Sequence, residues 1–230
     1  TNRVLARIAD RVLEALPNSI RGAQCVCNPL RQEMICHDDP AARIGPRNGP
    51  LNILVLGGSL GASILNEVVP AALALMDAEQ RPVVTHQSGR AHIEALKQTY
   101  ETAGIRAHTV DFIEDMAGGY QWADLVVCRA GALTVAELAA MGVGSILVPY
   151  PHAVDDHQHT NAAYLAAQGA AIRVRQSEFT PQWLADQLKA MDRGRLTQMA
   201  LAARQQAKPD ATRHVADACE QVAKPLGVLA

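Results

Sequence analysis

The sequence has few aromatic residues, which make up 3% of its 230 positions. Ala, Val, Leu and Ile abound instead, which suits helices packed on a parallel sheet and disfavours a platform that stacks nucleic-acid bases. An excess of either charge is also lacking, because 21 Lys and Arg face 23 Asp and Glu and give a net charge of -2. No global field therefore attracts nucleic acid or an anionic membrane, and any phosphate binding must be local.

Long hydrophobic runs and paired cysteines are missing as well. No apolar run approaches the roughly 20 residues that span a bilayer, and the first residues lack the apolar core of a signal peptide. The 5 cysteines are scattered, without a C-x-x-C pair or the Cys/His spacing of zinc sites. We expect reduced thiols and a cytoplasmic protein that is soluble or only peripherally attached to a membrane. The chain starts without Met, directly in a helical pattern, so we also expect a fragment of a longer protein.

From Asn52 onward, short aliphatic runs alternate with longer helical stretches. Such alternation is typical of repeated βα units and predicts an α/β domain with a parallel sheet. The expected strands lie at residues 53–56, 83–86, 108–110, 125–128 and 146–149, and late helices are expected at 181–191, 195–207 and 211–222. Right-handed crossovers bring the loops after these strands to one edge, where open α/β sheets bind ligands.

The chain divides around residues 37–51, which are rich in Pro, Gly and charge and are expected to form a linker over the surface. Residues 1–36 precede this linker. The main α/β domain is expected at 52–207, and a final helix within 208–230.

The clearest sign of a ligand site is a glycine loop after the first of these strands, with the sequence Gly57-Gly58-Ser59-Leu60-Gly61. Glycines let the backbone turn sharply and approach a ligand, while the N–H groups and dipole of the next helix favour an anion. Ser59 adds a hydroxyl donor to a phosphate oxygen. The G-G-x-x-G spacing differs from the dinucleotide and Walker fingerprints, which disfavours NAD and ATP. A tight turn whose glycines serve packing alone is the alternative.

A second loop follows the strand at 125–128 and opens a helix near Ala132. That start places Glu137 one to two turns into the helix, where its carboxylate can accept hydrogen bonds from a ribose diol. A solvated helix carboxylate is the alternative. Ile113 follows the strand at 108–110, where its backbone can meet a planar base. Arg31 lies in a turn before a helix, and an ordinary surface arginine is the default interpretation.

A third polar cluster occupies residues 149–162, after the strand at 146–149, and offers the groups that sugar hydroxyls bind. It contains His152, Asp155, Asp156, His157, Gln158 and His159. This spacing matches no zinc-hydrolase pattern such as H-E-x-x-H, so a metal site is disfavoured. An exposed polar loop without function is the other alternative.

Taken in order, these motifs resemble the C-terminal half of the MurG family, which transfers N-acetylglucosamine (GlcNAc) from UDP-GlcNAc to lipid I in bacterial cell-wall synthesis. The resemblance runs over almost the whole chain. Its motifs are Thr1-Asn2-Arg3, Asn28-Pro29-Leu30-Arg31, Gly57-Gly58-Ser59-Leu60-Gly61-Ala62, His86-Gln87-Ser88-Gly89, Phe112-Ile113-Glu114-Asp115-Met116, Arg129-Ala130-Gly131-Ala132-Leu133-Thr134-Val135-Ala136-Glu137 and the loop at 155–162.

The resemblance implies a doubly wound, Rossmann-like sheet, the donor domain of a GT-B glycosyltransferase. Residues 1–36 would then be the remnant of an N-terminal acceptor domain and its crossover, and 208–230 would pack toward that missing domain. Cys27 stands where the family usually has glycine, and Leu60 and His157 stand where some members have glutamine, so only backbone contacts carry over there.

The resemblance also implies the donor contacts. They are Arg31 beside the nucleotide, Gly58, Ser59, Leu60 and Gly61 at the diphosphate, the Ile113 backbone at uracil, Ala132, Leu133 and Thr134 at the phosphates and sugar, Glu137 at the ribose, and His157 and Gln158 at the GlcNAc hydroxyls. No metal and no cofactor is implied.

The implied activity is inverting transfer of GlcNAc to lipid I by the full-length protein, attached peripherally to the cytoplasmic face of the bacterial inner membrane. The general base would lie in the missing half, so no catalytic residue is assigned, and the fragment alone is expected to bind its donor without turnover. No nucleic-acid partner is expected. Two alternatives stay open: another UDP-sugar enzyme of this fold, such as a UDP-GlcNAc epimerase or a glycolipid synthase, and a non-catalytic nucleotide-sugar-binding module.

Overall fold

A parallel sheet of 6 strands forms the centre of the fold, in the order β5-β4-β3-β6-β7-β8. The computed structural model describes residues 2–17, 20–58, 61–151 and 156–223. The strands are β3 (Asn52–Leu56), β4 (Val83–Gln87), β5 (His108–Val110), β6 (Leu125–Cys128), β7 (Gly144–Leu147) and β8 (Ala171–Arg173). The chain adds β4 and β5 on one side of β3 and then returns to the other side with β6. The predicted doubly wound parallel sheet is therefore confirmed, with its switch point between β3 and β6.

The strand predictions differ from the structure mainly at the last two strands. β5 and β6 have the predicted bounds, whereas β7 runs from Gly144 to Leu147 and ends before Pro149, which has no N–H to donate. The first residue of β7 is glycine, and a Cβ at this position would lie only 2.8 Å from the Cβ of Met199. β8 was not predicted, since its three residues end in the exposed Arg173 and form no long apolar run.

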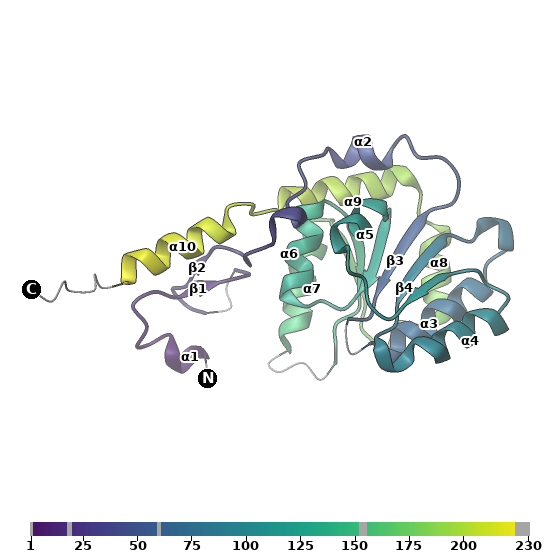
Figure 1. Cartoon of the computed structure of the whole chain (residues 1–230), viewed down its shortest axis with the longest axis horizontal. Helices are drawn as coiled ribbons and strands as arrows, with labels where there is room; N and C mark the ends of the chain where they lie inside the picture. Colours follow the sequence, from purple (N-terminus) through teal and green to yellow (C-terminus); the bar gives the residue numbers. More distant parts are fainter. Residues whose placement is uncertain (1, 18–19, 59–60, 152–155, 224–230) are drawn as a thin grey trace, which may run out of the picture.

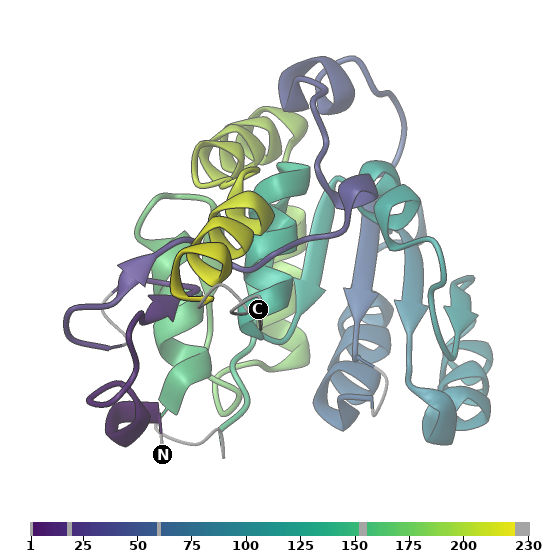
Figure 2. The ribbon, with the colours of Figure 1, turned by 60° about the vertical axis from the view of Figure 1, so that its left-hand side comes forward.

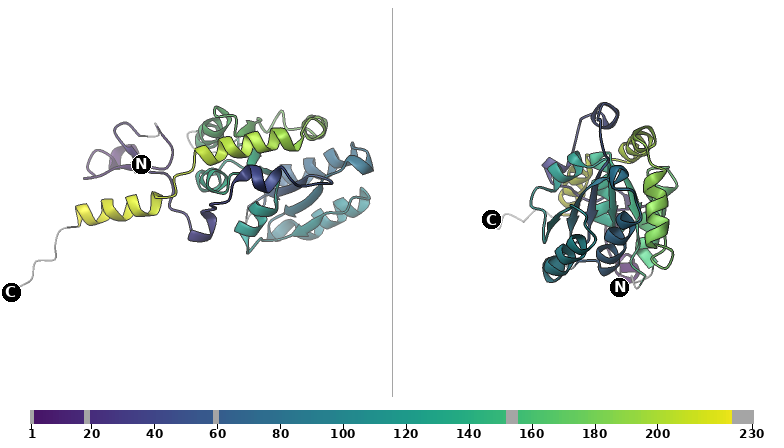
Figure 3. Two further views of the ribbon diagram at one scale, coloured as in Figure 1. Left: turned by 90° about the horizontal axis from the view of Figure 1, so that it is seen from above. Right: turned by 90° about the vertical axis from the view of Figure 1, so that its right-hand side faces the viewer.

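Helices cover both faces of the sheet (Figure 3, right). One face packs against α3 (Ser63–Ala74), α4 (Ile93–Thr102) and α8 (Pro181–Lys189), and the other against α5 (Met116–Trp122), α6 (Ala132–Met141) and α7 (His157–Ala166). Successive strand residues point to opposite faces, so Val55 joins the first core cluster and Leu54 the second. Because both faces are buried, the strands appear in the sequence as apolar runs without alternation.

The amino ends of the strands are closed by α9 (Arg193–Gln205), which contacts β7, and by α2 (Pro40–Ile44), which packs on α9. The segment predicted as a linker thus contains a short helix. Arg43 in that helix donates to the backbone carbonyls of Tyr120 and Ala123. These bonds hold the segment against the body of the fold.

The amino-terminal segment and the last helix extend together to one side of the α/β body (Figure 1 and Figure 3, left). They comprise α1 (Asn2–Leu5), the parallel pair β1 (Leu13–Glu14) and β2 (Gln24–Cys25), the 3-10 turn η1 (Gln32–Met34), and α10 (Ala211–Val222). The Arg11 guanidinium bonds Gln221 at 2.7 Å, which joins the two segments. The remaining 3-10 turns are η2 (Ala78–Gln80) and η3 (Arg90–His92). Among the residues described, no helix is both long enough and apolar enough to cross a membrane.

Candidate functional site

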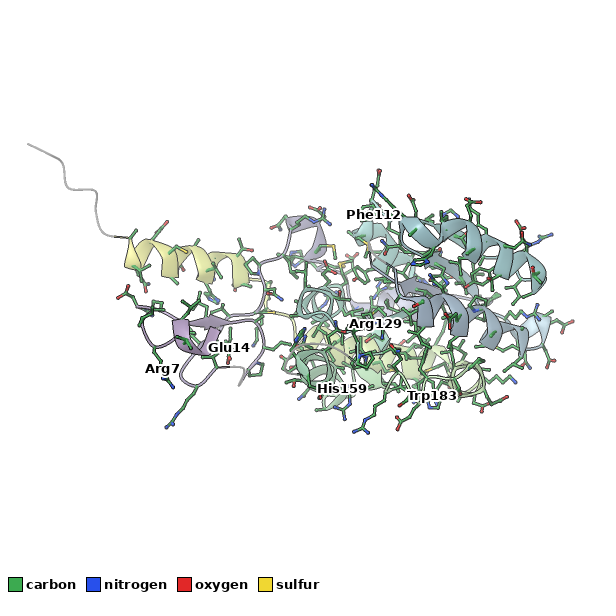
Figure 4. All side chains as sticks on the ribbon, turned by 90° about the horizontal axis from the view of Figure 1, so that it is seen from below. Arg7, Glu14, Phe112, Arg129, His159 and Trp183 are labelled. Atoms are coloured by element: carbon green, nitrogen blue, oxygen red, sulfur yellow. The ribbon has the colours of Figure 1, made fainter. Side chains whose placement is uncertain are left out.

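The predicted site residues gather along the edge where the parallel strands end and on the face covered by α5 and α6. In Figure 2 the blue arrows of β3 and β4 point down toward this edge. Figure 4 views the molecule from that side: Arg129 lies near the middle of the α/β body, with Phe112 on one side and His159 on the other. Loops from several strands therefore converge there, as expected for a doubly wound sheet.

Glycines with positive φ shape the loop after β3. Gly61 has φ +79°, and a Cβ on it would lie 2.3 Å from the carbonyl oxygen of Ser88. Its N–H bonds the carbonyl of Gly58 at 3.1 Å, and Gly58 has φ +77°. The chain then enters α3 at Ser63. Ser59 and Leu60, predicted at the diphosphate, lie outside the described residues.

The loop after β6 leads into α6, which begins at Ala132 as predicted. Gly131 precedes it with an extended backbone, and no side chain caps the helix. The first N–H groups of a helix have no acceptor within it, so those of the first turn are directed at the strand edge. Ala132, Leu133 and Thr134 supply that turn. Because β3 and β6 are neighbours and α3 and α6 lie on opposite faces, two helix N-termini converge at the switch point and favour an anion there.

Glu137 lies further along α6, where its carboxylate is half-buried. Its Oε2 accepts a hydrogen bond of 2.9 Å from the hydroxyl of Tyr120 in α5. Burial raises the pKa of Glu137, while the Tyr120 hydrogen bond and the charge of Arg31 act in the opposite direction. Burial also raises the pKa of Tyr120 well above its usual value, so this phenol keeps its proton and acts as the donor.

Arg31 directly precedes η1, which contacts both α5 and α6, and Ile113 lies in the loop before α5. The Arg31 side chain is 62% exposed and lies 3.1 Å from Glu33. The Ile113 side chain packs at the margin of the second core cluster. Its backbone nitrogen and oxygen have no hydrogen-bond partner among the described residues, so both are available to a ligand.

The start of α7 is tied to the loop that precedes α6. Gln158 Oε1 accepts the backbone N–H groups of Ala130 at 3.3 Å and of Tyr150 at 2.9 Å. Asn161 Nδ2 donates to the carbonyl of Ala130 at 2.9 Å. His157 is the first residue of this helix, and its side chain is exposed. The loops after β6 and β7 are thereby fixed to each other.

Residues that sequence reasoning did not assign to the site also shape it. Arg129 donates to the carbonyls of Val148 and Pro149 and lies 5.4 Å from the ring centre of Tyr150. Tyr120 holds Glu137, and a buried tyrosine in a helix carries no mark of that role in the sequence. No three His, Cys, Asp or Glu side chains of the described ranges lie close enough together to hold a metal ion. His152 and Asp155 fall outside those ranges.

The predicted residues therefore fall into connected groups. Gly58 and Gly61 shape the turn before α3, and Ala132, Leu133 and Thr134 form the first turn of α6. Arg31 precedes η1, Ile113 precedes α5 and Glu137 lies in α6, and η1 contacts both of these helices. Gln158 links the start of α7 to Ala130.

Residues 52–221 match the sequence model of the glycosyltransferase family 28 C-terminal domain. The UDP-N-acetylglucosamine--N-acetylmuramyl-(pentapeptide) pyrophosphoryl-undecaprenol N-acetylglucosamine transferase of Dechloromonas aromatica is 53% identical over 223 residues, covering 97% of this chain and 63% of that protein. The protein of the same name from Cupriavidus necator matches with the same identity and coverage.

Comparison with solved structures agrees with these sequence matches. The crystal structure of Acinetobacter baumannii MurG superposes with a TM-score of 0.85 and 42% identity, covering 96% of this chain and 62% of that one. A glycosyltransferase from Rickettsia africae, at 12% identity and a TM-score of 0.58, shares the fold alone. The chain thus has the α/β fold found in GT-B glycosyltransferases, and it spans 63% of the length of the relatives named above.

Proposed function

Because this chain belongs to glycosyltransferase family 28, we propose that it binds UDP-GlcNAc as the donor part of an enzyme that transfers GlcNAc to lipid I. Its relatives are named for this transfer, from UDP-N-acetylglucosamine to the N-acetylmuramyl-(pentapeptide) pyrophosphoryl-undecaprenol acceptor. Residues 52–207 form the donor domain in this proposal. Residues 1–36 and 208–230 belong with the acceptor domain that the longer relatives would supply.

The observation that carries the proposal is the geometry of α6. Its N-terminus and that of α3 follow neighbouring strands at the switch point, where their N–H groups and the positive ends of their dipoles would bind a diphosphate. Glu137 lies five residues beyond Ala132 on the same helix, about 7.5 Å along its axis. That separation suits a ribose whose diol reaches the carboxylate while its 5′ phosphate stays at the helix start.

In this proposal, polar groups on either side of the diphosphate site contact the two ends of the nucleotide sugar. Uracil would meet the backbone of Ile113, beside Arg31, and the GlcNAc hydroxyls would meet His157 and the side-chain amide of Gln158. The Gln158 oxygen is engaged by two backbone N–H groups, so its Nε2 is the atom directed to the sugar.

The chemistry follows from this placement. An acceptor hydroxyl attacks the anomeric carbon, the bond to the diphosphate breaks, and UDP leaves with inversion. Negative charge that grows on the leaving diphosphate is stabilised by the N–H groups and dipoles of α3 and α6. The general base that deprotonates the acceptor comes from outside this chain, and the complete enzyme works peripherally at the cytoplasmic face of the inner membrane.

Calorimetric titration tests the donor site. We expect saturable binding of UDP and UDP-GlcNAc that persists in EDTA, no binding of NAD, and weaker binding after Glu137→Ala. Glu101→Ala, an exposed carboxylate on α4 at the other face of the sheet, is the matched control and should bind as the parent does. A folded chain that binds NAD but no uridine nucleotide would refute the donor assignment.

A second assay separates the transferase from an epimerase. The full-length protein should release UDP from UDP-GlcNAc only when a lipid I analogue is present. Interconversion of UDP-sugars without any lipid would favour the epimerase, and donor binding without transfer would favour a non-catalytic module.

A further inference from the structure

The hydroxyl of Tyr120 reaches Glu137 from inside the protein. Tyr120 is fully buried in α5, within the core cluster between the sheet and α6. Its hydroxyl donates to Oε2 of Glu137 at 2.9 Å. A buried phenol needs a hydrogen-bond partner, and here that partner is a residue of the proposed ribose site.

The two oxygens of Glu137 have different surroundings. Oε2 is held by Tyr120, whereas Oε1 accepts no hydrogen bond from any described residue. Because the phenol keeps its proton, it always presents a donor to the carboxylate and never competes with it for one. A glutamate side chain alone samples several rotamers, and each rotamer directs the carboxylate differently.

We propose that Tyr120 is a positioning residue that fixes the Glu137 carboxylate with one oxygen directed at the ribose hydroxyls, and so sets the preference of the site for ribonucleotides. This inference rests on the proposed function, because it needs a uridine nucleotide along α6. The hydrogen bond selects one orientation before the nucleotide arrives, so binding loses less side-chain freedom. The ribose diol then supplies the donors for the oxygen that Tyr120 leaves open.

Tyr100 provides a matched control for the loss of a buried phenol. It is also buried, and its hydroxyl lies 2.9 Å from Nδ1 of His86 on the opposite face of the sheet. Tyr100→Phe therefore removes a comparable buried hydrogen bond away from Glu137. Any effect of Tyr120→Phe that Tyr100→Phe shares reflects general loosening of the fold.

The test compares the affinities of UDP and 2′,3′-dideoxy-UDP for the parent chain and its variants by calorimetry. Tyr120→Phe keeps the packed ring and removes the hydroxyl, and we expect it to weaken UDP binding about five- to tenfold. Binding of 2′,3′-dideoxy-UDP should stay unchanged, and Tyr100→Phe should alter neither affinity. In a Glu137→Ala background, Tyr120→Phe should cause no further loss, because the residue acts only through Glu137.

Equal weakening of both nucleotides by Tyr120→Phe, or no weakening of either, would overturn this inference and leave the donor site intact. Failure of the parent chain to bind UDP would instead overturn the proposed function, and this inference with it. If Tyr120→Phe does not fold, a crystal structure of the parent chain with UDP decides the question. One carboxylate oxygen of Glu137 must still accept the hydrogen bond from Tyr120, and the other must contact the ribose. A carboxylate turned away from Tyr120 would contradict the inference.

Discussion

The side-chain oxygen of Gln158 lies 2.9 Å from the backbone nitrogen of Tyr150. The same oxygen accepts the N–H of Ala130 at 3.3 Å, so a single amide joins the loops after β6 and β7. Gln158→Met keeps the size of the side chain but leaves both N–H groups without this acceptor. We expect the free energy of unfolding to fall by about 1 to 2 kcal/mol, and the affinity for UDP-GlcNAc to fall more than that for UDP.

Gln158→Glu is the informative partner of that variant. A carboxylate oxygen still accepts both N–H groups, so thermal stability should stay near that of the parent. The amide donor to the sugar is gone, and the new charge repels the diphosphate, so UDP-GlcNAc binding should weaken. Equal losses of stability in the Met and Glu variants, followed by thermal denaturation, would count against the joining role of this oxygen.

The glycine loop after β3 allows a comparison within one turn. Gly58 and Gly61 both have positive φ, but a Cβ on Gly58 would meet no atom within 4 Å, whereas one on Gly61 would meet backbone at 2.3 Å. Gly58→Ala should therefore cost about 1 to 2 kcal/mol from the left-handed backbone alone. Gly61→Ala must also displace the strand-end residue Ser88 or its own loop, so we expect a larger loss of stability and no measurable UDP binding. Urea denaturation measures the stability of the two variants, and calorimetry measures their UDP binding. Equal effects of the two substitutions would contradict this order.

The proposed ribose contact should depend on pH. Burial raises the pKa of Glu137, so its carboxylate takes up a proton at a higher pH than an exposed glutamate does. UDP affinity should fall as pH falls through that raised pKa, because the ionised carboxylate is the better acceptor. The groups that face it are Arg31 from the segment before η1, Tyr120 from α5 and the thiol of Cys128 in β6, whose pKa burial raises.

Two comparisons isolate this titration from that of the diphosphate. Binding of 2′,3′-dideoxy-UDP reports the phosphates alone, and Glu137→Gln should remove the difference between the two nucleotides. The Tyr120 hydrogen bond lowers the pKa of Glu137, so Tyr120→Phe should move the fall in UDP affinity to higher pH. A midpoint that stays in place or moves to lower pH would contradict the assigned contacts.

The sequence predicts the fold best where one local pattern decides the structure. β5, β6 and α10 have the expected bounds, and α6 begins at Ala132. The apolar run of β6 and the glycine before α6 are visible in the sequence without knowledge of tertiary partners. The candidate site follows from the same logic, since the loops after parallel strands must share an edge.

The features that sequence reasoning did not predict depend on residues far apart in the chain. Arg43 makes the segment at 37–51 part of the body through carbonyls 77 and 80 residues later. Tyr120 acts on Glu137 from another helix, 17 residues away, and only the packing of α5 on α6 brings them together. Neither pairing has a local spacing that a single sequence displays.

A buried carboxylate, Asp124, pairs with two arginines near the amino ends of the strands. Asp124 has no exposed side-chain surface, and its carboxylate lies 2.7 Å from Arg47 and 3.5 Å from Arg193. Its Oδ2 also accepts the backbone N–H of Asn52 at 2.9 Å, where β3 begins. Asp124→Asn removes the charge that both guanidinium groups face. We expect a loss of about 3 kcal/mol, the lower end for a buried pair that loses one partner, because both arginines keep partial contact with water.

Asp210→Asn is the matched control for this substitution. Asp210 pairs with Arg213 at 3.0 Å, but both side chains are more than half exposed, so the change should stay within about 0.5 kcal/mol. Urea denaturation of both variants measures the difference. UDP affinity of folded Asp124→Asn should equal that of the parent, since Asp124 precedes β6 and the proposed site begins after that strand ends. Similar stabilities for the two variants would show that the arginines find other partners when the buried carboxylate is lost.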